Sequence, residues 1–147
     1  MALSDPVPGG FDADGADLPA PSDAAVVELT VPANTSYLGV VRTASAGLAA
    51  RLGFTLDEIE DLRIAVDEAC VMLLSLRAIE APTLTCRFSV GLDALNVAVS
   101  ATVDRRATMP AEQSFAWHVL TAHADVVTGW AEGGIATVEL VKRRRRR

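Results

Sequence analysis

The sequence predicts an α+β fold, a two-layer sandwich in which a mostly antiparallel sheet carries about three helices on one face. Two pairs of short strand-like runs are each joined by a tight, glycine-containing turn, which is typical of antiparallel hairpins. A long helical run carries one wide apolar stripe, so it needs a single surface to pack on. The 147 residues suffice for one domain with a sizeable core.

The elements are expected in the order strand, two helices, hairpin, helix, hairpin. Asn34 or Thr35 can cap the first helix and Gly53 can end it. Pro82 prevents the second helix from continuing. The expected ranges are strand 24–31, helices at about 36–52 and 56–79, strands 83–90 and 95–103, a loop at 104–112, helix 114–124, and one strand on each side of the turn at 132–134.

The second helix is the most informative segment. Thr55 can cap its first turn, and Glu58, three residues later, completes a capping box. Its apolar stripe consists of residues at helical spacing, namely Ile59, Leu62, Val66, Ala69, Cys70 and Leu73. Glu68 lies at the edge of this stripe, so we expect it near the boundary between core and solvent.

Composition narrows the class of protein. The net charge is −6 although the last six residues are all basic, and an acidic body argues against nucleic acid as the main partner. No apolar run approaches the roughly 20 residues that span a bilayer, and the first 23 residues have no basic start or apolar stretch typical of a secretory signal. We therefore expect a cytoplasmic protein with no membrane contact.

The cysteines and tryptophans are expected inside the protein. Cys70 and Cys86 are interpreted as buried, reduced thiols, with a disulfide or redox switch as the alternative. Trp117 and Trp130 are interpreted as core anchors. No Cys or His spacing suggests a metal site.

The two ends of the chain are expected to lie outside the folded part. Residues 1–23 are rich in Pro, Gly, Asp and Ala and are expected to be disordered. Residues 24–142 form the domain, and 143–147 form a basic arginine tail. We expect that tail to be solvated, with a contact to nucleic acid or an acidic partner as the alternative.

Residues 59–76, IEDLRIAVDEACVMLLSL, resemble the N-box of the GHKL (histidine-kinase-like) ATPase superfamily. The pattern IxxLxxAVxEAxxNxxxH of its bacterial anti-sigma factors (RsbW-like serine-protein kinases) aligns with this segment from Ile59, and its final histidine falls at Leu76. The resemblance extends over about residues 26–142 and is strongest to the actinobacterial stress and sporulation type, through LRxAVDExC and SFxWHVLTA. It implies a GHKL (Bergerat-like) fold and assigns the family's catalytic glutamate to Glu68.

Several motif positions depart from this family. Its magnesium-holding asparagine falls at Met72, and its phosphate-loop glycines fall at Ser114 and Ala116. Asp104 is the nearest substitute for the adenine-binding aspartate, and Arg105 follows it. A thioether cannot replace an oxygen ligand of Mg²⁺, and a phosphate loop needs glycines for close backbone approach. We therefore expect no cofactor and no metal, with ATP and Mg²⁺ as the family alternative. Glu68 is then either a surface carboxylate or the general base.

The resemblance implies a regulatory function. Such a protein binds and sequesters an alternative sigma factor until an anti-anti-sigma antagonist releases it, and family members often form homodimers. The family's sigma-binding region includes the first helix, which here places Tyr37, Val41 and Arg42 at the interface. A guanidinium can pair bidentately with a carboxylate, so Arg42 is a suitable anchor. The alternatives are an active serine-protein kinase that phosphorylates the antagonist, and a small-molecule sensor in the vestigial nucleotide pocket.

Overall fold

The computed structural model describes residues 25–78, 80 and 82–145. The tail predicted at 1–23 lies outside these residues. The described elements, in chain order, are β1 (Ala25–Pro32), the 3-10 turn η3 (Thr35–Tyr37), α1 (Leu38–Arg51), α2 (Leu56–Leu76), β2 (Thr83–Val90), β3 (Ala94–Thr102), α3 (Phe115–His123), β4 (Val126–Glu132) and β5 (Ile135–Arg143).

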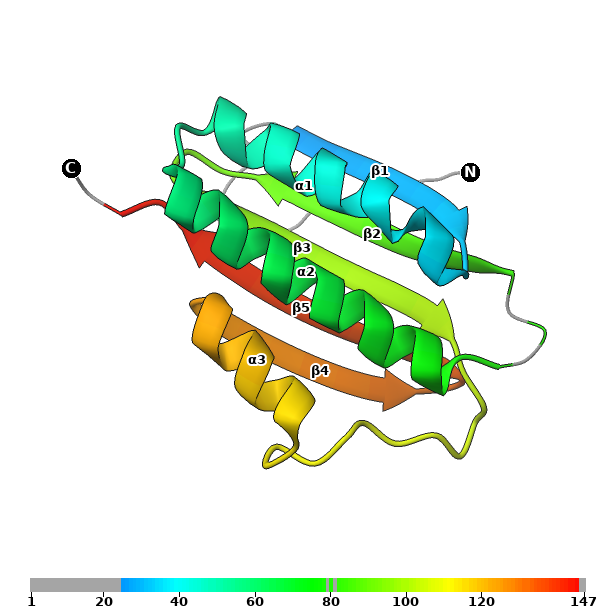
Figure 1. The fold of residues 1–147 in the computed structure, drawn as a ribbon. Helices are drawn as coiled ribbons and strands as arrows, with labels where there is room; N and C mark the ends of the chain where they lie inside the picture. Colours follow the sequence, from blue (N-terminus) through cyan, green and yellow to red (C-terminus); the bar gives the residue numbers. More distant parts are fainter. Residues whose placement is uncertain (1–24, 79, 81, 146–147) are drawn as a thin grey trace, which may run out of the picture.

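The five strands form one antiparallel sheet in the order β1-β2-β3-β5-β4. The three α-helices cover one face of this sheet, with α2 between α1 and α3 (Figure 1). The predicted fold class is therefore confirmed. The order of elements also agrees with the sequence, because each hairpin turn lies where its glycines were found.

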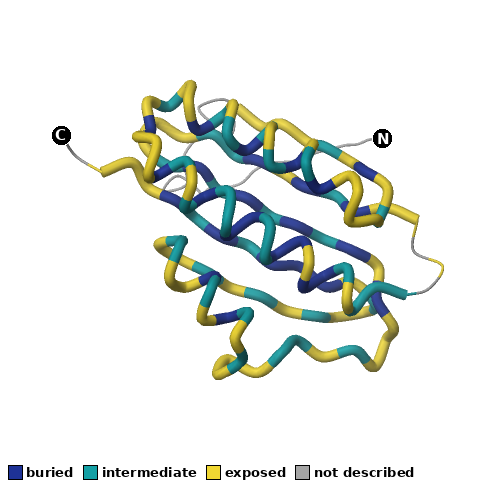
Figure 2. Tube along the Cα trace, in the orientation of Figure 1, coloured by how far each residue is buried: buried dark blue, intermediate teal, exposed yellow. Residues whose placement is uncertain are grey.

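The core lies between the helices and the inner face of the sheet, where the buried residues line α2 and alternate along the strands (Figure 2). Leu62, Val66 and Leu73 of α2 are fully buried. Inward-pointing side chains of β2 and β3, such as Phe88 and Val97, are fully buried in the same cluster. Alternation along a strand and helical spacing along α2 thus produce one continuous apolar layer.

The start of α2 was predicted correctly and its end was not. The Thr55 hydroxyl accepts a hydrogen bond from the Glu58 N–H (3.1 Å), and the Glu58 carboxylate accepts one from the Thr55 N–H (2.7 Å). The helix ends at Leu76 rather than near residue 79, because Arg77 is extended (φ −62°, ψ 148°) and pairs with Val103 as an isolated bridge.

Two further predictions need correction. Trp117 is buried as predicted (8% exposed), but Trp130 is 44% exposed, because it points to the sheet face that carries no helix. The basic end is not a solvated tail throughout: β5 continues to Arg143, Lys142 is buried, and the Arg145 N–H donates to Glu58 at 2.7 Å. Strand pairing and buried acceptors hold this segment.

Candidate functional site

The family's catalytic position and its magnesium position lie on the same helix but in different surroundings. Glu68 is half-buried on α2. Met72, one turn later, is 3% exposed and packs in the hydrophobic core. A buried thioether at this position adds to the apolar core and offers no oxygen to a hard cation.

The start of α3 does not form a phosphate loop. Ser114 is the N-cap, and its hydroxyl accepts a hydrogen bond from the Trp117 N–H at 3.4 Å. Ala116 follows in the first turn and is half-buried. The Ser114 hydroxyl therefore occupies the Trp117 N–H. At the start of a phosphate-binding helix, such an N–H would donate to the ligand instead.

Asp104 is bound within its own loop. It is exposed, and its carboxylate accepts a hydrogen bond from the Arg106 N–H at 2.8 Å. A cavity of about 700 Å³ lies nearby, between the loop before α3, α3 itself and β4. Glu68, Asp104, Ser114 and Ala116 are not among its lining residues.

Trp117 lines that cavity and contacts both the loop and β4. Its indole Nε1 donates to the Pro110 carbonyl at 2.6 Å, which holds the loop against α3. Its ring packs over Gly129 of β4, where an added Cβ would lie 2.7 Å from the ring. The cavity is lined by residues of the loop, α3 and β4, namely Met109, Pro110, Ala111, Glu112, Trp117, Thr121, Val127, Thr128 and Gly129.

The predicted partner-binding residues separate into two environments. Tyr37 is 43% exposed, whereas Val41 is fully buried with Leu38, Ser45 and Ala49 on the inner face of α1. Placing Val41 on the partner-binding surface was therefore wrong. Tyr37 lies in the 3-10 turn before α1. The α-helical rule that residues four apart share one face therefore does not apply to Tyr37 and Val41.

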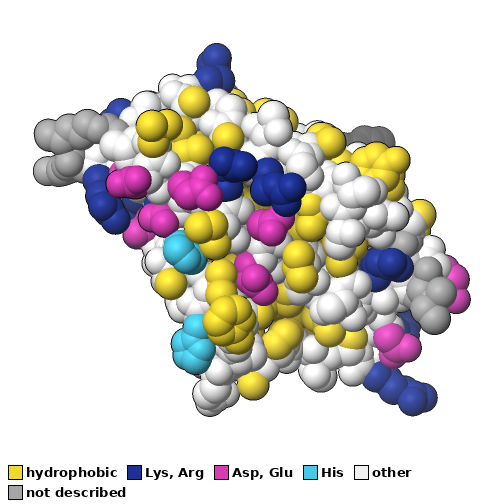
Figure 3. Space-filling view, viewed as in Figure 1, with side chains coloured by type: hydrophobic (Ala, Val, Ile, Leu, Met, Phe, Trp, Pro, Cys, Tyr) yellow, Lys and Arg dark blue, Asp and Glu magenta, His cyan; other side chains and the backbone are white. Residues whose placement is uncertain are grey.

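Arg42 bridges α1 and α2. Its guanidinium donates a hydrogen bond to the Asp67 carboxylate, and both side chains are 38% exposed. The pair lies in a hollow of about 210 Å³ that Glu60, Arg63 and Ile64 complete. Figure 3 shows acidic and basic side chains side by side on this helical face of the molecule.

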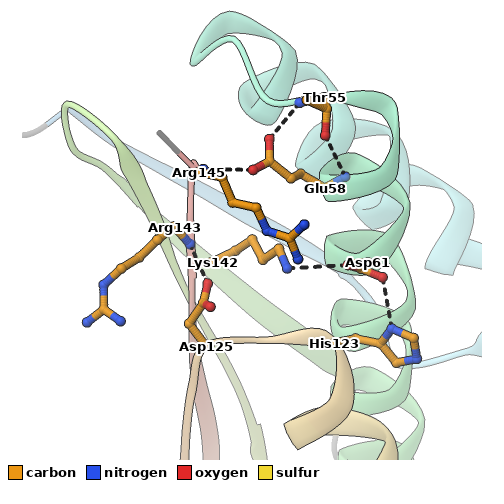
Figure 4. Close-up of polar contacts among 8 residues, drawn as sticks. All are labelled: Thr55, Glu58, Asp61, His123, Asp125, Lys142, Arg143 and Arg145. Atoms are coloured by element: carbon orange, nitrogen blue, oxygen red, sulfur yellow. Dashed lines mark hydrogen bonds and ion pairs between the residues drawn. The ribbon is translucent and has the colours of Figure 1, made fainter. Parts of the chain in front are cut away.

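A second charged cluster was not predicted from the sequence. Asp61 of α2 lies 3.0 Å from His123 Nδ1 of α3 and 3.4 Å from Lys142 Nζ of β5 (Figure 4). Burial would raise the pKa of Asp61, but the hydrogen bond with His123 and the charge and hydrogen bond of Lys142 hold that pKa below its ordinary value. The sequence gives little indication of this cluster, because Asp61 lies outside the apolar stripe of the helix and its position is typical of a solvated carboxylate.

Comparison with known proteins gives a consistent relationship. No protein-family model matches the chain. The serine-protein kinase RsbW of Halalkalibacterium halodurans is 40% identical over 74 residues, which are 50% of this chain and 46% of that protein. RsbW of Bacillus subtilis is 51% identical over 49 residues, 33% of this chain and 31% of that protein. RsbW of Bacillus licheniformis is 36% identical over 76 residues, 50% of this chain and 48% of that protein.

Over these segments the chain is similar to RsbW. The matched segments span less than half the length of each of these curated relatives. The fold also matches the solved structure of the RsbU and RsbW domains of Rv1364c from Mycobacterium tuberculosis, with a TM-score of 0.65 over 84% of this chain and 33% of that chain. At 16% identity, this match concerns the fold alone.

Among the residues that the structure describes, no three His, Cys, Asp or Glu side chains gather to hold a metal ion. The residues at the family's nucleotide positions do not fit Mg·ATP, since Met72 lacks an oxygen and Ser114 caps its own helix. No helix within the described ranges is long and apolar enough to cross a membrane.

Proposed function

We propose that this chain is an anti-sigma factor that binds and sequesters an alternative RNA polymerase sigma factor. An anti-anti-sigma antagonist would compete for it and release the sigma factor. The proposal rests on the RsbW-like sequence and fold. It includes one domain over about residues 24–142, which β5 extends to Arg143 and the backbone hydrogen bonds of Arg144 and Arg145 extend further.

The proposed protein acts by binding, with little or no phosphoryl transfer. The observation that carries this view is Met72, buried in the core where the family holds magnesium through an asparagine. Phosphoryl transfer needs a metal that bridges the phosphates and a base that orients the nucleophile. Without that metal, Glu68 has no activated phosphoryl group toward which to direct a serine hydroxyl.

The proposed partner-binding surface lies at the start of α1 and along its contact with α2. Tyr37 offers an exposed aromatic ring, and Arg42 offers a guanidinium that is only partly covered by Asp67. Aromatic residues and arginine are the usual anchors of protein interfaces. A partner carboxylate could replace Asp67 on the guanidinium, so recognition would exchange one ion pair for another.

The main test is capture of partners from the source cell. The tagged full-length chain is incubated with a lysate, and the bound proteins are identified by mass spectrometry. A sigma factor that binds directly in a repeat with purified components supports the proposal. If no sigma factor of the source cell binds the purified chain in the absence of the antagonist, the proposal is contradicted. Light scattering of the purified chain tests the homodimer that the family resemblance implies.

The kinase alternative is tested separately. Calorimetric titration with Mg·ATP is expected to show no binding in the micromolar range, and no phosphate transfer to the antagonist serine is expected. Micromolar affinity with turnover would establish the active serine-protein kinase instead.

A small-molecule sensor is the second candidate, and the cavity beside Trp117 favours it. Its volume of about 700 Å³ falls in the range of ligand sites. Glu68, Asp104, Ser114 and Ala116 do not line it, so a sensor would bind its ligand through other residues than the family's nucleotide positions. Ligand screening by tryptophan fluorescence, with Trp130→Phe to isolate the Trp117 signal, tests this candidate.

A further inference from the structure

A further hollow lies where α2 ends and the connection between β1 and α1 begins, and the functions proposed above do not use it. Its volume is about 460 Å³, and it shares no lining residue with the Arg42 hollow or with the cavity beside Trp117. Figure 1 shows the end of α2 and the start of α1 on the same side of the molecule, at the right. Its lining includes Asn34, Thr35, Val71, Leu74, Ser75 and Arg77, and we call it the Arg77 hollow.

The Arg77 guanidinium lacks a counter-charge. Its Nε is covered by protein and has no hydrogen-bond acceptor among the residues that the structure describes. None of the ion pairs between described side chains involves Arg77. The amide oxygen of Asn34, on the rim of the hollow, already accepts hydrogen bonds from the N–H and the hydroxyl of Ser36, both at 2.9 Å. A covered donor without an acceptor costs free energy, so its presence calls for a binding partner.

The backbone of Arg77 is held by the sheet. Arg77 is extended directly after α2 and pairs with Val103 in an isolated antiparallel bridge. Of the described acids nearby, neither Glu80 nor Asp104 forms an ion pair with Arg77. Asp104 instead accepts a hydrogen bond from the Arg106 N–H at 2.8 Å. The side chain therefore starts from a fixed point and keeps an uncompensated positive charge.

The rest of the hollow is open and partly apolar. Val71 is 42% exposed and Leu74 is half-buried, and no residue of the lining is acidic. Small-molecule sites usually enclose most of their ligand, whereas an open hollow can receive a protruding part of another protein. Charge complementarity then favours a carboxylate that lies beside an aliphatic side chain.

We propose that the Arg77 hollow binds a segment of a partner protein in which an aspartate or glutamate carboxylate lies beside an aliphatic side chain. The aliphatic side chain packs on Val71 and Leu74. Rotation about the terminal bonds of the Arg77 side chain turns its Nε–H and one Nη–H toward the carboxylate, which accepts both hydrogen bonds. The hollow contains neither Tyr37 nor Arg42, so this contact goes beyond the proposed sigma-binding surface and does not depend on it.

The test uses the folded, full-length chain labelled with nitrogen-15 and a minimal probe, the peptide acetyl-leucyl-glutamate amide. Millimolar binding should shift the NMR signals of the Arg77 Nε–H and of the amides that line the hollow. The glutamine analogue of the peptide has the same shape without the charge, so it should bind at least about tenfold more weakly. Inorganic phosphate at equal ionic strength should not reproduce the shifts. An unmoved Arg77 Nε–H, or an equal response to the glutamine analogue or to phosphate, would overturn the proposal.

Arg77→Met separates binding from stability, because methionine keeps an unbranched apolar stem and removes the donors. It should weaken peptide binding at least about tenfold and leave the Tm unchanged or slightly raised, since no donor is then left without an acceptor. Arg87→Met is the matched control, because Arg87 is exposed and pairs with Glu28 away from the hollow, and it should bind the peptide like the parent. A cation near the carbonyl end of α2 can also stabilise the helix. If Arg77→Met lowers the Tm by several degrees and binds the peptide like the parent, Arg77 has only that structural role and the proposal fails.

Discussion

Asp61 joins three elements, because its carboxylate contacts His123 of α3 and Lys142 of β5. The Lys142 side chain is only 6% exposed, so its ammonium depends on this carboxylate for charge compensation. A buried ion pair adds little compared with well-packed apolar side chains, but removal of one partner is costly. The effect of a substitution here on the free energy of unfolding therefore depends on whether Lys142 keeps its carboxylate partner.

Asp61→Asn is expected to lower the free energy of unfolding by about 1–3 kcal/mol, because a buried ammonium loses its anionic partner. Urea unfolding measures this change. Glu60→Gln is the matched control, since Glu60 is 59% exposed in a surface pair with Arg63, and it should shift stability by no more than about 0.5 kcal/mol. Adding Lys142→Met to Asp61→Asn should recover most of the loss. A double variant no more stable than Asp61→Asn would refute the pairing argument.

The depressed pKa of Asp61 predicts how this contribution depends on pH. A carboxyl group whose folded-state pKa lies below the unfolded value adds stability above the unfolded pKa, and loses it as pH falls through the folded pKa. The ordinary value is 3.8, and the folded value lies lower. The measurement is made in a His123→Gln background, in which residue 123 carries no ionisable group and its amide can still donate a hydrogen bond to Asp61. In that background, the stability lost through Asp61→Asn should stay constant above about pH 5 and shrink below the ordinary value. A loss that persists unchanged to about pH 2 would contradict the assignment.

At the scale of elements, α1 and α2 are joined by apolar packing inside and by Arg42–Asp67 outside. Arg42 therefore has two roles in the proposal, since it holds α2 through Asp67 and would also bind the partner. Charge reversal at Arg42 tests both roles at once, so the two effects must be separated by a compensating change at Asp67.

Arg42→Glu is expected to weaken sigma-factor binding roughly thirtyfold, as for an anchoring arginine. It should also cost up to about 1 kcal/mol of stability, because two carboxylates then face each other. Arg42→Glu with Asp67→Arg should restore stability but not affinity. Arg87→Glu on the helix-free sheet face is the control, since Arg87 also faces a carboxylate, Glu28. If Arg42→Glu binds the sigma factor with parental affinity, the interface lies elsewhere on the domain. Arg63 is unsuitable as a control, because it lines the same hollow as Arg42.

The contact between α3 and β4 depends on the absence of a side chain at Gly129. An added Cβ would lie 2.7 Å from the Trp117 ring and 3.1 Å from Met109 Cε. Gly129→Ala should therefore lower the free energy of unfolding by about 1–3 kcal/mol through overpacking. Gly47→Ala on α1 meets no atom within 4 Å and should raise it by up to about 1 kcal/mol. Chemical unfolding of both variants checks the opposite signs, and a neutral Gly129→Ala would show that the indole can move aside.

At the scale of the whole molecule, the C-terminal segment connects regions that are far apart in the sequence. Arg144 donates from its N–H to the Asp93 carbonyl (2.7 Å) and from its guanidinium to the Leu52 carbonyl (3.3 Å). The Arg145 N–H donates to Glu58, whose side chain is 1% exposed. The two residues that follow β5 thereby form hydrogen bonds with the segment that joins α1 to α2, with the first turn of α2 and with the β2–β3 turn.

Truncation after Arg143 is expected to cost about 1–3 kcal/mol and to lower the Tm by several degrees, because the buried Glu58 carboxylate loses one of its donors. Differential scanning calorimetry measures the change. A solvated tail, as expected from the sequence, would cost almost no stability when trimmed. Arg144→Ala/Arg145→Ala keeps both backbone donors and should change stability much less than the truncation does. Equal losses in the two variants would assign the effect to charge rather than to the backbone contacts.

The sequence by itself determined the fold class, the order of the elements, the capping box at Thr55 and the RsbW-like relationship. The fold class, the element order and the cap follow from local patterns, since apolar spacing, turn glycines and caps act over a few residues. The RsbW-like relationship rests instead on the resemblance of its motifs to those of a known family. It also identified Met72, Ser114 and Ala116 as departures from the family's nucleotide motifs.

Only the tertiary structure decided which side chains are buried and which charges meet. Asp61, His123 and Lys142 come from three elements. Val41 lies on the buried face of α1 with Leu38, Ser45 and Ala49, whereas Tyr37 lies in the 3-10 turn before that helix. Trp130 remains exposed because the helices cover only one face of the sheet. Contacts between residues distant in sequence depend on sheet order and helix placement, and no local pattern records these.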